Sequence, residues 1–228
     1  MLKSLAALLF PKTCAGCAST LSGGESIICT TCSHQMPYTQ HHEIAENEIF
    51  KRFYGRLPLQ YASALVYFNK RGIVQQLIHS LKYKGQQDIG TLMGQWYVPY
   101  LQQVTVLQTV TDVVPVPLHP KKLRERGYNQ VDAFAKTIAQ GLNANYNTTT
   151  LVRTTYTKTQ TKKNLANRAS IIGSAFDVAY NETTPTSKHF LLIDDVMTTG
   201  ATLEACGKAI LKIPNSTLSI VTIAYTHI

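Results

Sequence analysis

The stretch at residues 190–202 constrains the fold of this chain more than any other. Its continuous apolar run predicts a strand that is buried on both faces, as in a parallel sheet. Two adjacent carboxylates, Asp194 and Asp195, end the strand, and small hydroxyl residues with a glycine follow them. Apolar residues then recur at helical spacing from Leu203 to Ile213. The stretch therefore predicts a strand, a tight loop and a helix, with acids beside the amino terminus of the helix.

The loop in this stretch has the chemistry of phosphate binding. The first amides of a helix lack internal partners, and the helix dipole places partial positive charge there. Gly200 lets the backbone approach a ligand closely, and the threonine hydroxyls add donors. The two carboxylates suit sugar hydroxyls or a mostly hydrated Mg²⁺ instead. The stretch thus indicates a sugar phosphate; an ordinary strand and capped helix is the alternative, although packing alone explains adjacent carboxylates poorly.

Two CxxC pairs lie near the amino terminus. They are Cys14, Cys17, Cys29 and Cys32. Each pair can present two thiolates from a tight turn, and two such turns complete a tetrahedral zinc site. Disulfides are one alternative, which a cytoplasmic location disfavours, and redox chemistry is another, for which one pair would suffice. We therefore predict structural zinc, with His34, His41 and His42 facing solvent and Cys206 in the core.

Length and charge narrow the class of protein. A chain of 228 residues fits one ordinary core with a small appendage, and a net charge of +9 favours an anionic partner such as a sugar phosphate or nucleic acid. No stretch is long enough to span a bilayer. The apolar residues 5–10 run into Pro11 without a cleavage pattern, so we expect a short docked helix rather than a signal peptide. The expected location is the cytoplasm.

Strand and helix patterns alternate through the rest of the chain. Strands are expected near 61–68, 112–118, 151–153, 174–178 and 218–224, and helices near 73–81, 89–101 and 131–142. This alternation predicts a parallel sheet with right-handed crossovers. The run from Lys82 to Gly85 suits either an ordinary helix end or a contact with a phosphate or base. The basic stretch at 154–168 suits either an exposed connection or a lid.

A basic segment follows the proline-rich strand end at 112–118. It carries four cationic side chains around Glu125, at the carboxyl end of a strand, where ligands bind in open α/β sheets. The four are Lys121, Lys122, Arg124 and Arg126. Asn129 is a candidate cap for the helix that begins near residue 131.

The order of these features resembles the ComF family, with the GntX-type proteins. The resemblance is carried by Leu9–Pro11, the two CxxC pairs, Leu81–Lys84, Val114–Pro117, Arg126–Gln130, the series Arg153, Gln160 and Arg168, and residues 190–202. The last stretch is similar to the thirteen-residue signature of the type I phosphoribosyltransferases. The resemblance implies an α/β fold, with a parallel sheet flanked by helices and a small amino-terminal zinc ribbon. Residues 1–55 would form the ribbon and linker, and residues 56–228 the phosphoribosyltransferase-like domain.

The family resemblance also implies roles for the site residues. Asp194 and Asp195 would be the catalytic acids that bond the ribose hydroxyls of 5-phosphoribosyl 1-pyrophosphate, which binds with Mg²⁺. The loop around its 5-phosphate would be Thr198, Thr199, Gly200, Ala201 and Thr202. The segment Pro117–Arg126 would be the pyrophosphate loop, with its four cations stabilising the leaving group. The basic stretch at 160–168 would be the flexible active-site loop.

The implied function is phosphoribosyl transfer, a glycosyltransferase reaction, in natural competence and DNA uptake. The alternative is a non-catalytic single-stranded DNA-binding module for transformation that retains the ligand-binding fold. The expected partners are 5-phosphoribosyl 1-pyrophosphate or a nucleotide, together with single-stranded DNA and DNA-processing proteins of transformation. Some relatives are linked to sugar-acid utilisation. The sequence does not identify the acceptor.

Overall fold

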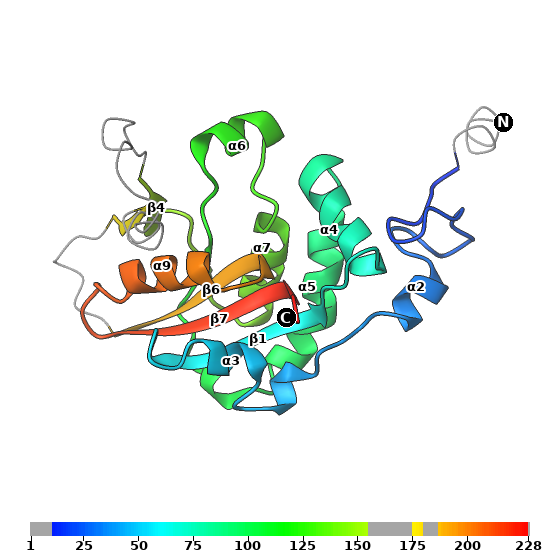
Figure 1. Ribbon diagram of the computed structural model, residues 1–228. Helices are drawn as coiled ribbons and strands as arrows, with labels where there is room; N and C mark the ends of the chain where they lie inside the picture. Colours follow the sequence, from blue (N-terminus) through cyan, green and yellow to red (C-terminus); the bar gives the residue numbers. More distant parts are fainter. Residues whose placement is uncertain (1–10, 155–174, 180–186, 228) are drawn as a thin grey trace.

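The computed structural model describes residues 11–154, 175–179 and 187–227, and its centre is a five-stranded sheet (Figure 1). In spatial order the strands are β1 (Leu59–Tyr67), β7 (Ser216–Tyr225), β6 (Lys188–Met197), β2 (Asp112–Pro115) and β3 (Asn145–Tyr146). All neighbouring strands in this sheet are parallel. The predicted parallel α/β fold is therefore confirmed. The signature strand, β6, lies in the middle, which explains its continuous apolar run.

Alternate residues of β6 face two separate apolar cores. Leu191 and Ile193 belong to the core that contains α5 (Asp88–Leu101) and α7 (Asp132–Gly141). Phe190 and Leu192 belong to the core that contains α9 (Ala201–Ile210) and the residues around α3 (Glu48–Arg52). Because successive side chains of a strand point to opposite faces, one apolar run supplies both layers.

The amino-terminal cysteine region packs against α4 (Ile73–Tyr83). Val74 and Leu77 of α4 share one buried cluster with Cys14 and Cys32. The contact is close, since a Cβ added to Gly16 would lie 2.9 Å from the Ile73 Cγ2 atom. The short helix α2 (Thr30–His34) continues this region (Figure 1). One helix therefore joins the cysteine region to the body of the protein.

The linker after the cysteine region also joins the core. Ile49 and Phe53 are buried in the same cluster as α9. Asn47 caps α3 by accepting hydrogen bonds from the amides of Ile49 and Phe50, and its own amide donates to the Ala62 carbonyl at 2.7 Å. The domain boundary at residues 55 and 56 stays a prediction.

Two short strands and one short helix differ from the sequence expectation. The strands β4 (Leu151–Arg153) and β5 (Phe176–Val178) form where strands are predicted, but they pair with each other, antiparallel, outside the main sheet. The basic segment forms a helix, α6 (Pro120–Arg126), that the sequence analysis does not predict. Proline at its first turn and Gly127, at a φ of 80°, just past its end are both typical helix-end residues.

The prediction that the three histidines face solvent is wrong for His41 and His42. The His42 side chain is 12% exposed, and its ring centroid lies 4.4 Å from that of Tyr100. His41 is 1% exposed and lies against the rings of Tyr67 and Tyr225, whereas His34 is exposed. The cause is pairing of the linker with β1, because the Thr39 amide donates to the Leu65 carbonyl at 3.1 Å. The 3₁₀ helices η1 (His41–Glu43) and η2 (Thr105–Thr109) complete the described elements.

The proposed cap at Asn129 is also wrong. The α7 helix begins after Val131, and the buried Asn129 amide instead donates to the Val116 carbonyl at 3.0 Å. Asn129 therefore ties the start of α7 to the loop after β2.

Some expectations lie outside the described residues. These are the apolar helix at 5–10 and the basic stretch from 155 to 168, with Gln160 and Arg168. Within the described part of the chain, no helix combines the length and apolar character that crossing a membrane requires.

Candidate functional site

The two carboxylates at the end of β6 occupy different environments. Asp195 is 5% exposed, and its Oδ2 atom lies 2.8 Å from both the Lys82 Nζ and the Gln130 Nε2. Asp194 points to the opposite face, as the strand pleat requires, and its Oδ1 accepts the Asp195 amide at 2.8 Å. Burial, together with the adjacent negative charge of Asp195, raises the pKa of Asp194. The predicted acid pair is therefore one anchored carboxylate and one that faces the following loop.

The loop after the acids is a tight turn that starts α9. Gly200 has a φ of 77° and is the N-cap of this helix. A Cβ at this position would lie 3.0 Å from the Phe53 ring and 3.1 Å from the Met197 Cε, so glycine is favoured by both backbone and space. Thr198, Thr199 and Thr202 are exposed. With Asp194 and the backbone around it, the loop borders a hollow of about 40 Å³.

Arg56 connects the linker to this loop. Its guanidinium donates to the Thr199 carbonyl at 3.2 Å and to Glu204 Oε2 from its Nε at 2.8 Å. Glu204 lies in the first turn of α9 and also pairs with Lys208 at 2.6 Å. The loop that the sequence assigns to phosphate is thus held in place from the linker side.

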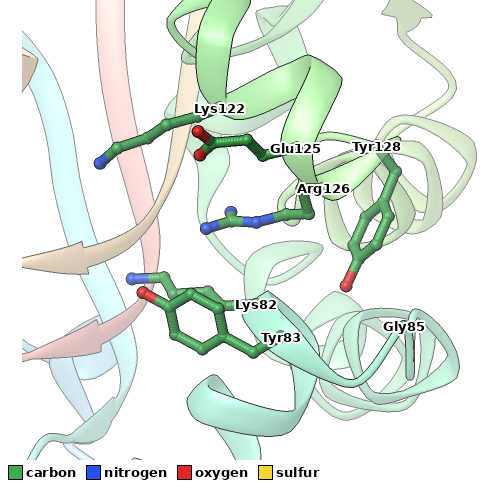
Figure 2. A pocket seen from close by; sticks show the side chains of 7 residues that line it. All are labelled: Lys82, Tyr83, Gly85, Lys122, Glu125, Arg126 and Tyr128. Carbon is green, nitrogen blue, oxygen red and sulfur yellow. The ribbon is translucent and has the colours of Figure 1, made fainter.

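A larger cavity of about 380 Å³ lies between the end of α4 and α6 (Figure 2). It is lined by Lys82, Tyr83, Gly85, Lys122, Glu125, Arg126 and Tyr128. Of the four cations that the sequence assigned to pyrophosphate, Lys122 and Arg126 line this cavity. The other two do not line it. The Lys121 Nζ lies 3.9 Å from the Glu125 Oε1, and Arg124 is exposed on α6.

Lys82 and Gln130 connect the cavity to the acids, and the sequence analysis did not assign either of them to the site. Lys82 lines the cavity while its ammonium pairs with Asp195. Gln130 donates to Asp195 and accepts a hydrogen bond from Arg126. The sequence did contain signals, because both residues lie in runs that carry the family resemblance. Gly85, at a φ of 70°, follows the end of the helix, as the first interpretation of the run 82–85 requires. Contact of this run with a phosphate or base stays a prediction.

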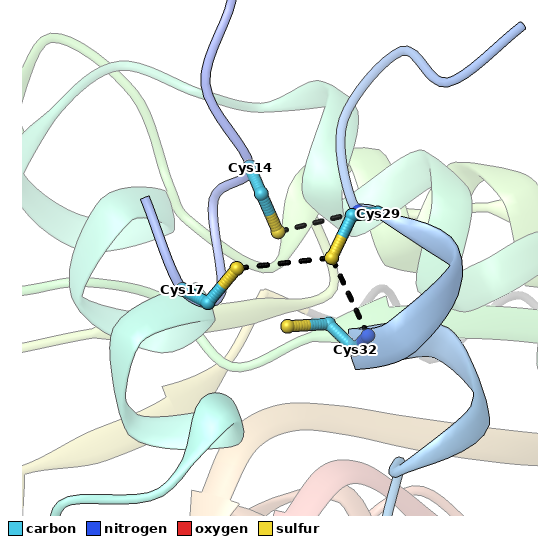
Figure 3. A group of neighbouring side chains, drawn as sticks. All are labelled: Cys14, Cys17, Cys29 and Cys32. Atoms are coloured by element: carbon cyan, nitrogen blue, oxygen red, sulfur yellow. Dashed lines mark hydrogen bonds between the residues drawn. The ribbon is translucent and has the colours of Figure 1, made fainter. Parts of the chain in front are cut away.

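The four cysteines lie together, as their spacing predicts (Figure 3). One ligand atom from each lies within 4.8 Å of the others, and the Sγ atoms of Cys17 and Cys29 are 3.7 Å apart. A tetrahedral zinc site with Zn–S bonds of about 2.3 Å requires sulfur atoms about 3.8 Å apart. The cluster therefore fits a metal such as zinc.

Backbone donors support the thiolate form of the cluster. The amides of Gly16 and Cys29 donate to the Cys14 sulfur at 3.3 and 3.2 Å, and the Cys32 amide donates to the Cys29 sulfur at 3.4 Å. Hydrogen bonds from Ser19 lower the pKa of Cys17 to about 6, whereas burial and the neighbouring thiols raise the pKa of Cys32. A bound metal would hold such thiols in the deprotonated form that ligation requires.

Together these features define a class of α/β protein. Its central parallel strand carries two carboxylates near its carboxyl end and leads into a glycine turn, and its amino-terminal region carries a four-cysteine cluster that fits a metal. Over 147 residues, 63% of its length, the chain is 26% identical to DNA utilization protein YhgH of Escherichia coli O157:H7. Over 101 residues it is 30% identical to competence protein F of Haemophilus influenzae, with 44% of each chain covered. These relatives confirm the resemblance to the ComF family.

The similarity to these relatives covers only part of their length. The chain matches 60–63% of the length of the YhgH proteins, and no model of a known protein family matches it. Among solved structures, adenine phosphoribosyltransferase from Leishmania tarentolae is similar with a TM-score of 0.38 and 10% identity, covering 79% of this chain and 88% of that one. A hypoxanthine phosphoribosyltransferase from Staphylococcus aureus is similar with a TM-score of 0.31 and 15% identity, covering 61% and 62% of the two chains.

Proposed function

We propose that this chain binds 5-phosphoribosyl 1-pyrophosphate with Mg²⁺ at the carboxyl edge of its sheet and serves as a phosphoribosyltransferase-like protein in competence and DNA uptake. The proposal rests on one observation: Asp194 and Asp195 lie near the carboxyl end of the central strand, which runs to Met197, and the Gly200 turn that starts α9 follows that strand. An acid pair suits a sugar, and a helix start suits its phosphate.

The phosphate end of the ligand is assigned to the turn. Residues 198–202 offer exposed threonine hydroxyls and the first amides of a ten-residue helix. The hollow beside them supports this assignment, since it leaves space for an anion at the turn. Gly200, which has no side chain, is one of the residues that line this hollow.

The sugar and pyrophosphate are assigned to the acids and the neighbouring cations. Asp194 and Asp195 accept hydrogen bonds from the ribose hydroxyls, and Lys82 and Gln130 hold Asp195 in place for this. Mg²⁺, when bound, would neutralise pyrophosphate charge, and these two carboxylates are the residues that would hold it. Of the α6 cations, Lys122 and Arg126 are the best placed to face the same charge.

The biological setting is proposed from the named relatives. Proteins called DNA utilization protein and competence protein F support a role in handling imported DNA in the cytoplasm. Single-stranded DNA and the proteins that process it are the partners that we propose.

Titration calorimetry tests the assignment. We expect the zinc-loaded protein to bind 5-phosphoribosyl 1-pyrophosphate in a Mg²⁺-dependent way, and the double variant Asp194→Asn with Asp195→Asn to bind at least about 100-fold more weakly, from two lost charge-assisted hydrogen-bond acceptors. Asp177→Asn is the matched control, because Asp177 is an exposed carboxylate that pairs with Lys212 at 2.9 Å. Retained affinity in the double variant would show that the site lies elsewhere.

A groove beside the cysteine module favours a second candidate function, the binding of single-stranded DNA. This groove, of about 380 Å³, lies between the first CxxC turn and α4. Among the described residues its lining includes Arg71 and Lys84, several neutral polar groups and no carboxylate. Such a groove suits a phosphate backbone. Affinity for a fluorescent oligodeoxythymidylate should fall as salt rises, and Lys84→Ala should reduce the salt slope by about one. A salt-independent signal would remove this candidate.

A further inference from the structure

The cavity between α4 and α6 has a lining that a bare pyrophosphate does not explain. Its cations are Lys82, Lys122 and Arg126, but Tyr83, Tyr128 and the carboxylate of Glu125 share the same space (Figure 2). A pyrophosphate has no ring to pack on tyrosine, and its negative charge is repelled by a carboxylate. The lining therefore points to a ligand that carries an aromatic ring as well as an anionic group.

The two tyrosines of the cavity differ in exposure and in what holds them. Tyr83 is 69% exposed, and the Arg126 guanidinium lies over its ring, 5.4 Å from the centroid. Tyr128 is fixed by its hydroxyl, which donates to the Leu81 carbonyl at 2.5 Å. An exposed ring beside a guanidinium is a stacking surface for another planar ring, and each base stacked on such a surface contributes roughly 1–3 kcal/mol.

The polar groups match the other parts of a nucleotide. The side chains of Lys122 and Arg126 extend toward the same side of the cavity in Figure 2, where a phosphate can meet both. Glu125 can accept a hydrogen bond from the exocyclic amino group of a base such as cytosine. The volume of about 380 Å³ lies within the range of roughly 300–1,000 Å³ that is typical of small-molecule sites.

The position of the cavity assigns this ligand to the neighbourhood of the sugar phosphate. Lys82 lines the cavity and pairs with Asp195 at 2.8 Å, so the two sites share a side chain. We propose that the cavity between α4 and α6 binds a nucleotide unit, with its base on Tyr83 and its phosphate on Lys122 and Arg126. The function proposed above, on which this placement rests, gives the same two cations to pyrophosphate, so the nucleotide and 5-phosphoribosyl 1-pyrophosphate would use them in turn.

Calorimetry on the full zinc-loaded chain tests this proposal, with cytidine 5′-monophosphate as the probe. We expect Tyr83→Ala to weaken its binding at least about tenfold, as loss of a stacking contact predicts. Tyr83 is exposed, so its removal should leave the fold intact. Tyr54→Ala is the control, because Tyr54 is also an exposed tyrosine, 52% accessible, but lies outside the cavity lining. Equal affinities of Tyr83→Ala and the parent chain would overturn the proposal.

Two further experiments are needed. One distinguishes a free nucleotide from a nucleotide within a DNA strand, and the other distinguishes this inference from the proposed function. A ten-residue single-stranded oligodeoxycytidylate that binds more than tenfold more tightly than the monophosphate, and still depends on Tyr83, identifies a strand as the ligand. Equal affinities, also dependent on Tyr83, identify the free nucleotide. The double variant Asp194→Asn with Asp195→Asn should lose 5-phosphoribosyl 1-pyrophosphate but keep cytidine monophosphate. A parent chain that binds only the nucleotide would refute the proposed function and leave this inference standing.

Discussion

The cysteine cluster and the strand-end site are built in different ways. All four thiols come from residues 14–32, and the local backbone donates hydrogen bonds to two of their sulfurs. The strand-end site instead joins Lys82, Gln130 and Asp195, which come from α4, the segment before α7 and β6. The cluster is local in the chain, whereas the strand-end site depends on how the elements pack.

This difference separates what stabilises each region. The cysteine region has few regular elements, so we expect it to depend on a bound ion for much of its order. The strand-end site lies on the central strand of a sheet with apolar cores on both faces, so we expect it to keep its shape without a ligand. Three predictions test this contrast.

The largest effect should follow the loss of one thiol. Cys14→Ser should weaken zinc binding by more than about 100-fold, above the 10–100-fold that is typical of changes around the ligands. The physical reason is that Cys14 accepts two backbone hydrogen bonds as well as offering a ligand. Competition with a chelator measures the affinity. Cys206→Ala is the control, since Cys206 is buried outside the cluster and its loss should leave the metal content unchanged. Full zinc affinity in Cys14→Ser would contradict the assignment.

A smaller effect is expected at the strand-end loop. Gly200→Ala should lower the free energy of unfolding by about 2–4 kcal/mol, from backbone strain and overpacking against Phe53. Gly55→Ala is the control that measures backbone strain alone, because Gly55 has a φ of 69° and nothing lies within 4 Å of an added Cβ. We expect it to lower the free energy of unfolding by about 1–2 kcal/mol. Urea unfolding measures both. Equal losses at the two positions would mean that the loop is not closely packed.

The smallest effect is a pH dependence at Asp194. Because its pKa is raised in the folded protein, the folded state binds this proton more tightly than the unfolded state does. Stability from this group is therefore present below the ordinary carboxyl pKa of about 4 and is lost as pH rises through the raised value. The stability of Asp194→Asn should therefore increase relative to that of the parent chain as pH rises from 4 to 8.

Urea unfolding at several pH values measures this gain. Asp177→Asn should show the opposite sign, because hydrogen bonding from Lys212 lowers the pKa of Asp177. Parallel pH profiles of Asp194→Asn and the parent chain would show that Asp194 ionises normally.

What the sequence predicts follows the same division between local and distant contacts. The cysteine cluster and the strand, acid pair and turn at 190–202 could be predicted because each lies within a short segment. The partners of Asp195 could not be predicted, because Lys82 and Gln130 are far from it in the sequence and contact it only after the elements have packed. His41 was misplaced for the same reason: pairing of the linker with β1, rather than any local pattern, buries its ring. The pairing of β4 with β5 likewise depends on a contact between distant segments.

The helix α4 touches both regions, through Val74 and Leu77 at the cysteine cluster and through Lys82 at Asp195. Thermodynamic linkage makes any communication along it reciprocal. Whatever factor the metal contributes to ligand affinity at the strand end, the ligand must contribute to metal affinity at the cysteines. The extent of zinc retention would then report whether the proposed sugar-phosphate site is filled, without any turnover being observed.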